Sequence, residues 1–574
     1  MRSVPRPADR KENSGASGWW KAAGVGAALL CCWLLYAPAF HGPFVFDDAS
    51  LPFSRTMRVE ALPAWLTDVR PVLMASYWLN FRLWGDDPTS YHVLNTLIHA
   101  INAVLVFLVL YRLLSLAGLV KPQSIRMAVL GSLIFLVHPL QPESVSYVAG
   151  RSESLSALFE LLAYTVFLYR RREGISWFES LLVLGLFLLG VRTKENAVSL
   201  FGFLILTDLF WPKPFTAAGL RKNWRLYLLA IPGAAVAGIY VLRVLATSAS
   251  AGFSLSTVSW LQYFFTESRA IFRYIQMAVV PVGLSIDHDF PVSYTLFEHG
   301  AMVWILLLAA TVIAGWLMRH KYPLASFGLF FFLAGLAPTS SFVPIADPLV
   351  DRRMYLPILG LILMAIEVCR SVRIPRRAGW YAAAAVLVAF SIACYHRNVE
   401  WGQPEELFAA AADQSTHNLR PYLHLTEVLV HENSCAPAIP YLERADRLFP
   451  NSVEIAAAWS WADECMGRLN EAMQKLQKAA SFRPRSSLIY QWIGLLYGEM
   501  RMPVEAGDAL RHAEELDPGS ITAHEAMGLW YRGMGDLAAA EKEYRTSLSI
   551  DPLDPTARAA IAQVRELEAA GRPR

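Results

Sequence analysis

The sequence predicts an all-α protein in two parts: a polytopic membrane helical bundle with about eleven spans, and a tetratricopeptide-repeat α-solenoid. Apolar runs of near-membrane length fill residues 19–397, whereas residues 398–574 have mixed charge and no such run. In that second part prolines recur every 34 residues. Only 17% of the chain is charged, against roughly 25% in globular domains, and this favours a membrane protein.

A short tail, residues 1–18, precedes the first predicted span. The predicted spans are 19–40, 91–112, 127–139, 154–170, 177–190, 196–211, 225–244, 302–318, 322–339, 355–369 and 379–395. Lys and Arg collect in the tail and in the loops after the second, fourth, sixth, eighth and tenth spans. Because cytoplasmic loops are rich in these residues, we expect a cytoplasmic N-terminus and a non-cytoplasmic repeat domain.

Two segments have alternative interpretations. Residues 259–284 are apolar but contain Glu267, Arg269 and Arg273. An interfacial helix there, rather than a twelfth span, keeps every basic loop on one side. The first span is alternatively a signal peptide cleaved near Ala37–Ala39, which would leave the remaining topology unchanged.

The repeat prolines are Pro450, Pro484, Pro518 and Pro552. They define units at 419–452, 453–486, 487–520 and 521–554, with a half-unit before them and a polar cap at 555–571. Small residues recur inside the units, as expected where paired helices approach closely. The period predicts a concave surface for a polypeptide partner, although a purely structural stack is the alternative.

Cys435 and Cys465 begin and end helices that antiparallel stacking would bring together. A disulfide between them is one interpretation and requires an oxidising compartment. Two unrelated small residues are the other.

Adjacent carboxylates, Asp47 and Asp48, follow the first span. Further polar groups gather at the ends of later spans on the same predicted side: His92, His138, Glu143, Arg151, Glu153, Lys194, Glu195, Asp287 and Arg353. Ionisable groups beside membrane spans are costly, so this group indicates a site at the membrane–water boundary. The cations Arg151, Lys194 and Arg353 would suit a phosphate, and the carboxylates would suit a base.

Each of these residues also has a structural interpretation. Glu143, Arg151 and Glu153 would form ion pairs within loops, and His99 would donate a hydrogen bond between helices. No His or Cys pair has the spacing of a structural zinc site. The net charge of +3 argues against a nucleic-acid partner.

Several motifs occur in order along nearly the whole chain: FVFDDASL, YHVLNTLIHAINAVLVF, VHPLQPESVSYVAGRSESL, TKENAVSL, LSIDHDF and DPLVDRRMYLP. With the repeats, they resemble the transmembrane and tetratricopeptide-repeat containing protein O-mannosyltransferases. The array is shorter than in many animal members, and the chain resembles a bacterial relative, which would place it in the inner membrane.

The resemblance implies a GT-C glycosyltransferase that takes a sugar from a polyprenyl-phosphate donor on the non-cytoplasmic face. It carries the acidic motif of the first outer loop to Asp47 and Asp48, without choosing between them. No cofactor is then required; a divalent metal between the two carboxylates is an alternative that this mechanism does not need and that we do not expect. The repeats would hold a polypeptide acceptor near this loop.

Two other functions explain part of the sequence. A transporter or flippase of lipid-linked saccharides would also need a polar cavity, but no inverted repeat is evident. A membrane-anchored scaffold for envelope assembly would explain the repeats and leave the polar residues of the bundle without a role.

Overall fold

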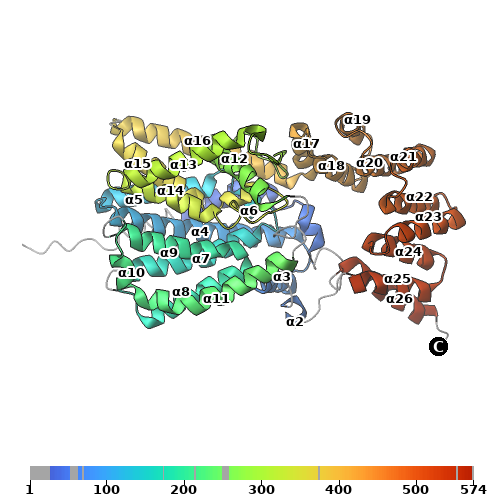
Figure 1. Cartoon of the computed structure of the whole chain (residues 1–574), viewed down its shortest axis with the longest axis horizontal. Helices are drawn as coiled ribbons and strands as arrows, with labels where there is room; N and C mark the ends of the chain where they lie inside the picture. Colours follow the sequence, from blue (N-terminus) through green and yellow to red (C-terminus); the bar gives the residue numbers. More distant parts are fainter. Residues whose placement is uncertain are drawn as a thin grey trace, which may run out of the picture.

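Apolar helices that run side by side form the first two thirds of the chain, and the repeat helices continue from one end of this bundle (Figure 1). We call that end the repeat end. The computed structural model describes residues 26–51, 62–66, 70–171, 174–211, 215–247, 258–372, 375–550 and 554–571. Within these ranges the regular elements are helices and there is no β-strand, which confirms the predicted all-α class. The predicted tail 1–18 and Pro552 lie outside them.

Each of the predicted spans coincides with a helix. They are Gly26–Ala39, α4 (Pro88–Leu116), α5 (Lys121–Val137), α7 (Arg151–Arg170), α8 (Trp177–Thr193), α9 (Ser199–Phe210), α11 (Trp224–Thr247), α13 (Ala301–Met318), α14 (Pro323–Leu336), α15 (Ile358–Ser371) and α16 (Arg376–Gly402). Among the described residues, α4, α11, α13 and α16 are long and apolar enough to cross a membrane by themselves. The chain is therefore a membrane protein by composition.

Further helices lie between these. They are α2 (Leu62–Trp65), α3 (Pro71–Trp84), α6 (Pro142–Val145), α10 (Ala218–Lys222) and α12 (Trp260–Val279). Helix α12 is the segment for which we expect an interfacial position, and it is not among the four long apolar helices. Its first turn is capped by Ser259, whose hydroxyl accepts the Gln262 N–H. Helix α3 was not predicted, because its apolar residues are broken by polar ones.

The bundle core consists of aliphatic and aromatic side chains between neighbouring helices. Phe203 of α9 stacks on Phe331 of α14 with ring centroids 3.9 Å apart. Tyr164 of α7 lies against both rings and donates to or accepts from the Thr207 hydroxyl at 2.7 Å. Its polar atom is thus satisfied inside the core, as burial requires.

Every predicted repeat unit contains two helices. The pairs are α18 (Arg420–His431) with α19 (Ala438–Leu448), α20 (Val453–Cys465) with α21 (Leu469–Phe482), α22 (Ser487–Glu499) with α23 (Pro503–Leu516), and α24 (Ile521–Gly533) with α25 (Leu537–Ile550). Helix α17 (Pro404–Gln414) precedes them and α26 (Pro555–Gly571) follows. A Cβ on Gly494 would lie 2.6 Å from Leu510 Cγ, so glycine permits the close contact of α22 with α23.

Cys435 and Cys465 form a disulfide, with Cα atoms 6.2 Å apart. It joins the loop before α19 to the end of α20, so it links two successive repeats. Between the bundle and the repeats, α16 passes into α17 through Gln403 alone. Trp401, Phe408 and Tyr147 belong to one buried apolar cluster, so the first repeat helices pack directly on the bundle.

Candidate active site

The two adjacent acids of the first loop have opposite environments. They lie in a short 3₁₀ helix, Phe46–Ser50. Asp48 is fully buried, and its carboxylate accepts the N–H groups of Ala149 at 2.6 Å and Val45 at 3.3 Å. Asp47 has an exposed side chain, and its own backbone N–H donates to the Tyr147 hydroxyl at 3.0 Å. Asp47 is therefore the acid that an incoming substrate would reach.

Burial raises the pKa of Asp48 to about 8, although the N–H donors of Ala149 and Val45 oppose the shift. An acid with this pKa is largely protonated at pH 7, so it is a poor proton acceptor from a surface substrate. Asp48 instead joins the first loop to the segment before α7 through its hydrogen bonds. The sequence does not decide which of the two acids accepts a proton. Burial of Asp48 favours Asp47 for this role.

The position of Asp47 depends on aromatic residues from both parts of the chain. Tyr147 stacks on Trp401, the residue near the end of α16, with centroids 5.4 Å apart. Phe46 adopts φ 55°, which is uncommon for a residue with a Cβ. Its ring centroid lies 5.0 Å from that of His424 in α18, the first repeat helix, and 6.5 Å from that of Phe408 in α17, the helix before it. The repeat helices thereby support the backbone on which Asp47 is mounted.

Three basic side chains with partial exposure lie at the same end of the bundle, each beside a carboxylate. Arg352 pairs with Glu143 at 2.5 Å, and Lys194 pairs with Glu153 at 2.5 Å. The third pair, Arg70 with Glu195, is bidentate, with N···O distances of 2.6 and 3.1 Å. The side chains of Arg352, Lys194 and Arg70 are 18%, 12% and 33% exposed, so each remains accessible.

The electrostatics place these cations close to one another. Burial lowers the pKa of the Lys194 ammonium, Glu153 opposes the shift, and the positive charges of Arg70 and Arg352 lower it further. Arg352 also acts on Tyr147: burial and the charges of Asp48 and Asp47 raise the pKa of that phenol, and Arg352 opposes them. Tyr147 therefore interacts with both acids of the first loop and with Arg352.

The Arg151 side chain is enclosed by protein, whereas an arginine that binds the phosphate of a substrate must be accessible. Arg151 is fully buried and donates to Asn95 Oδ1 at 2.6 Å and Asn80 Oδ1 at 2.9 Å. The guanidinium also lies over the Tyr77 ring, 4.6 Å from the centroid. Neutral amides and a ring face satisfy its donors, and Arg151 thus ties α7 to α3 and α4.

Arg353 turns away from the neighbouring Arg352. It donates to the carbonyl oxygens of Pro348 at 2.9 Å and Asp347 at 2.6 Å, and pairs with Glu267 of α12 at 3.4 Å. Its role here is to hold the 347–348 segment and α12 to the start of α15. The basic pair of DPLVDRRMYLP thus divides, with Arg352 toward the acidic loop and Arg353 toward α12.

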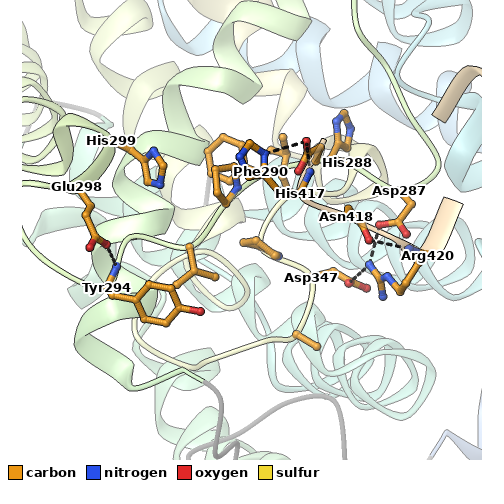
Figure 2. A pocket seen from close by; sticks show the side chains of 16 residues that line it. Asp287, His288, Phe290, Tyr294, Glu298, His299, Asp347, His417, Asn418 and Arg420 are labelled. Atoms are coloured by element: carbon orange, nitrogen blue, oxygen red, sulfur yellow. Dashed lines mark hydrogen bonds and ion pairs between the residues drawn. The ribbon is translucent and has the colours of Figure 1, made fainter. Parts of the chain in front are cut away.

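Asp287 lies in a separate cavity of about 740 Å³ between the bundle and the first repeat (Figure 2). Asp287 and Asp347 converge on Arg420 of α18, each 2.6 Å from Nη2. Nearby, Asp289 accepts the N–H groups of Thr416 at 2.7 Å and His417 at 3.0 Å. These contacts fasten the repeats to the bundle, and they form a group of their own, distinct from the contacts of Asp47.

The two predicted histidines are both buried and bonded to backbone. Nε2 of His92 lies 3.2 Å from the Gly42 carbonyl oxygen, which ties α4 to the first loop. Nε2 of His138 lies 2.9 Å from the Ala278 carbonyl oxygen, and its Nδ1 accepts the Leu140 N–H. Both rings connect elements through backbone groups, and the buried Nδ1 of His92 has no hydrogen-bond partner.

Sequence reasoning missed Arg70, Tyr147 and Arg352 as site residues. Arg352 and Tyr147 stand inside the motifs DPLVDRRMYLP and VSYVAG, so those motifs were the available signal. Nothing in the sequence separates Arg352 from Arg353, because both have the same charge and differ only in the direction of their side chains.

Comparison with known proteins shows which proteins this chain is similar to. The Tetratricopeptide repeat family model matches residues 521–552, the fourth repeat. Protein O-mannosyl-transferase TMTC3 of Mus musculus is 23% identical, covering 80% of this chain and 58% of its own length. Protein O-mannosyl-transferase TMTC4 of Homo sapiens is 24% identical, covering 74% of this chain and 66% of its own length. The chain is a homologue of these proteins.

This homology confirms the resemblance seen in the ordered motifs. The chain spans a little over half the length of the mouse relative it matches. Among solved structures, a thermophilic TPR protein from Thermus thermophilus is 19% identical, covering 31% of this chain and 95% of that chain with a TM-score of 0.26.

Proposed function

We propose that this protein is a membrane glycosyltransferase that transfers mannose, or a closely similar sugar, from a polyprenyl-phosphate donor to a hydroxyl group of a polypeptide. The observation that carries the proposal is the exposed Asp47, whose backbone N–H is held by Tyr147, together with the partly exposed cations Arg352, Lys194 and Arg70 at the same end of the bundle. The names of the homologous proteins supply the sugar and the acceptor class.

In the proposed reaction the acceptor hydroxyl oxygen bonds to the anomeric carbon while the bond from that carbon to the phosphate oxygen breaks. Asp47 takes the hydroxyl proton as general base. The lipid phosphate leaves with the bonding electron pair, and its charge changes from one negative charge to two. Attack opposite the leaving group inverts the anomeric carbon.

Cations beside the phosphate would stabilise this increase in negative charge more strongly in the transition state than in the ground state. We assign that role to Arg352 and Lys194, since both are partly exposed and Arg352 interacts with Tyr147, which accepts the Asp47 N–H. Their partners Glu143 and Glu153 would hold them in position before the donor binds. No metal is assigned to this step, because Asp48 is already occupied by backbone donors and Asp47 is the exposed acid.

We further propose that the repeat end faces the non-cytoplasmic side. The basic loops at the opposite ends of the spans support this orientation. The Cys435–Cys465 disulfide supports it too, because disulfides persist in oxidising compartments. A polypeptide held by the concave face of the repeats would then lie on the same side as Asp47.

The test is sugar transfer by purified protein in lipid vesicles, with polyprenyl-phosphate mannose and a Ser/Thr-rich polypeptide. Wild-type protein should label the polypeptide, and Asp47→Asn should lower kcat by about 10²–10⁴-fold, the usual contribution of a general base. Asp48→Asn is the matched neighbour, and its kcat should fall far less. Unchanged transfer by Asp47→Asn, or none by the wild type, would contradict the proposal.

A further inference from the structure

A second group of ionisable side chains lies far from Asp47, at the boundary between the third and fourth repeats. Glu514 comes from α23, His524 from α24 and Glu543 from α25. Nδ1 of His524 lies 3.0 Å from Glu514 Oε1 and 2.9 Å from Glu543 Oε2. The His524 residue is 8% exposed, and the two glutamate side chains are 23% and 14% exposed.

The hydrogen bond on the far side of the ring determines what Nδ1 can do. Nε2 of His524 lies 3.1 Å from the carbonyl oxygen of Pro518. A carbonyl oxygen only accepts, so Nε2 carries the hydrogen. In the neutral ring Nδ1 then carries a lone pair and is an acceptor. It faces two carboxylate oxygens, which are also acceptors. Three acceptors so close together are stable only with a cation among them.

In the part of the chain that the structure describes, no arginine or lysine side chain supplies that cation. Among the described residues, neither Glu514 nor Glu543 forms an ion pair with an arginine or lysine. The buried Oε1 atom of Glu514 has no hydrogen-bond partner, although it faces the site. A buried carboxylate oxygen without a donor is costly, and a bound cation removes that cost.

We propose that Glu514, His524 and Glu543 bind a divalent transition-metal ion of the zinc class. Their ligand atoms lie within 4.8 Å of one another. Zinc bonds of about 2.0–2.2 Å in a tetrahedral arrangement put ligand atoms roughly 3.3 Å apart, close to the spacing here. A metal-bound histidine usually donates its other N–H to a carbonyl or carboxylate, as His524 does to Pro518.

The bound ion would connect three helices across a repeat boundary. Repeat arrays are stabilised mainly by contacts between neighbouring units, so a metal here would stiffen the end of the array. Next to it lies a groove of about 710 Å³ lined by Trp492, Thr522, Leu529 and Tyr544 among others. Thr522 lies on α24 with His524, and Tyr544 lies on α25 with Glu543, so the ion would fix the two helices that supply these walls of the groove. The site is independent of the glycosyltransferase proposal.

The experiment uses the full chain in detergent, without a histidine tag, stripped with EDTA and then dialysed against zinc. Metal per protein is measured by elemental analysis, and thermal unfolding is followed with Zn²⁺, Mg²⁺ or EDTA. The test variants are His524→Asn and Glu543→Gln. His512→Asn is the control, because His512 lies exposed on α23 and pairs only with Glu515 among the described acids.

Wild type and His512→Asn should retain one more zinc equivalent than His524→Asn and Glu543→Gln, and Zn²⁺ but not Mg²⁺ should raise their Tm. Circular dichroism verifies that each variant is folded. If His524→Asn is not folded, Glu543→Gln alone tests the proposal. Equal zinc content in wild type and both variants would overturn the proposal. So would the absence of zinc uptake by the wild type, which would mean that the cation at Nδ1 is a proton alone.

Discussion

The backbone N–H of Asp47 donates to the hydroxyl of Tyr147 across 100 residues of sequence, at 3.0 Å. Tyr147 in turn stacks on Trp401, where the bundle meets the repeats. The exposed acid of the first loop is therefore held by a residue that contacts both parts of the chain.

Tyr147→Phe should lower kcat for sugar transfer by roughly tenfold and change KM little. The substitution removes the acceptor for the Asp47 N–H and keeps the ring on Trp401, so the loop loses one hydrogen bond of about 1 kcal/mol. Steady-state kinetics measure this. The control is Tyr490→Phe, on the distant helix α22. A change in KM alone would argue against a positioning role.

The free energy of unfolding should depend on Asp48 between about pH 4 and pH 8. Its pKa in the folded protein, about 8, is above the value of 3.8 expected in the unfolded chain. Folding therefore favours the protonated acid, and the stability that this provides at low pH is lost as the pH rises toward 8. The loss is on the order of 5 kcal/mol, from the size of the pKa difference.

Thermal unfolding of wild type and Asp48→Asn in detergent across this pH range measures the effect. Asparagine keeps an oxygen for the Ala149 N–H and does not titrate. The Tm of the wild type should fall with rising pH relative to that of the variant. Parallel curves would show that Asp48 does not titrate in this range.

Arg352→Gln should weaken binding of the lipid-phosphate donor and raise its KM. The single variant also leaves Glu143 without its cation, which adds a structural cost. The double variant Arg352→Gln with Glu143→Gln removes both charges and separates the two effects. If the double variant restores stability but not donor binding, Arg352 contacts the phosphate. Full recovery of KM would assign Arg352 a structural role only.

Arg420→Ala should loosen the repeats from the bundle. Arg420 is the shared partner of Asp287 and Asp347, and its loss would leave the largely buried Asp287 carboxylate unpaired. Limited proteolysis between α16 and α18 should become faster. Arg444→Ala removes an exposed pair with Asp413 and is the matched control, for which the cleavage rate should stay unchanged.

Cys465→Ser should destabilise the repeats by about 2–4 kcal/mol, since it opens the loop closed by the disulfide with Cys435. Thermal unfolding with and without reductant measures this, and reductant should affect the wild type and the control but not Cys465→Ser. Cys369→Ser, at an exposed free cysteine, is the control. Non-reducing mass spectrometry that finds both thiols free would contradict the pairing.

The helices of this protein follow from local features of the sequence. These features are the apolar runs of membrane length, the 34-residue proline period and the small residues at helix crossings. Each can be recognised from the order of residues along the chain, without contacts between distant segments. Each predicted span and repeat unit therefore coincides with helices in the structure. Helix α3 was not predicted, since the role of its apolar residues is determined only by their packing on α8 and α4.

The identity of the site residues depends on contacts between segments far apart in sequence. Asp47 and Asp48 are equivalent in the sequence, and only the fold buries one beneath the 145–149 segment and exposes the other. Arg352 and Arg353 are separated in the same way, by the direction in which a short 3₁₀ turn points each side chain. Arg151 carries the charge expected of a phosphate site, but Asn80 and Asn95 enclose it. The charge of each side chain and its position in the sequence are properties of the chain alone. Its exposure to solvent and its hydrogen-bond and ion-pair partners are determined only when the helices pack.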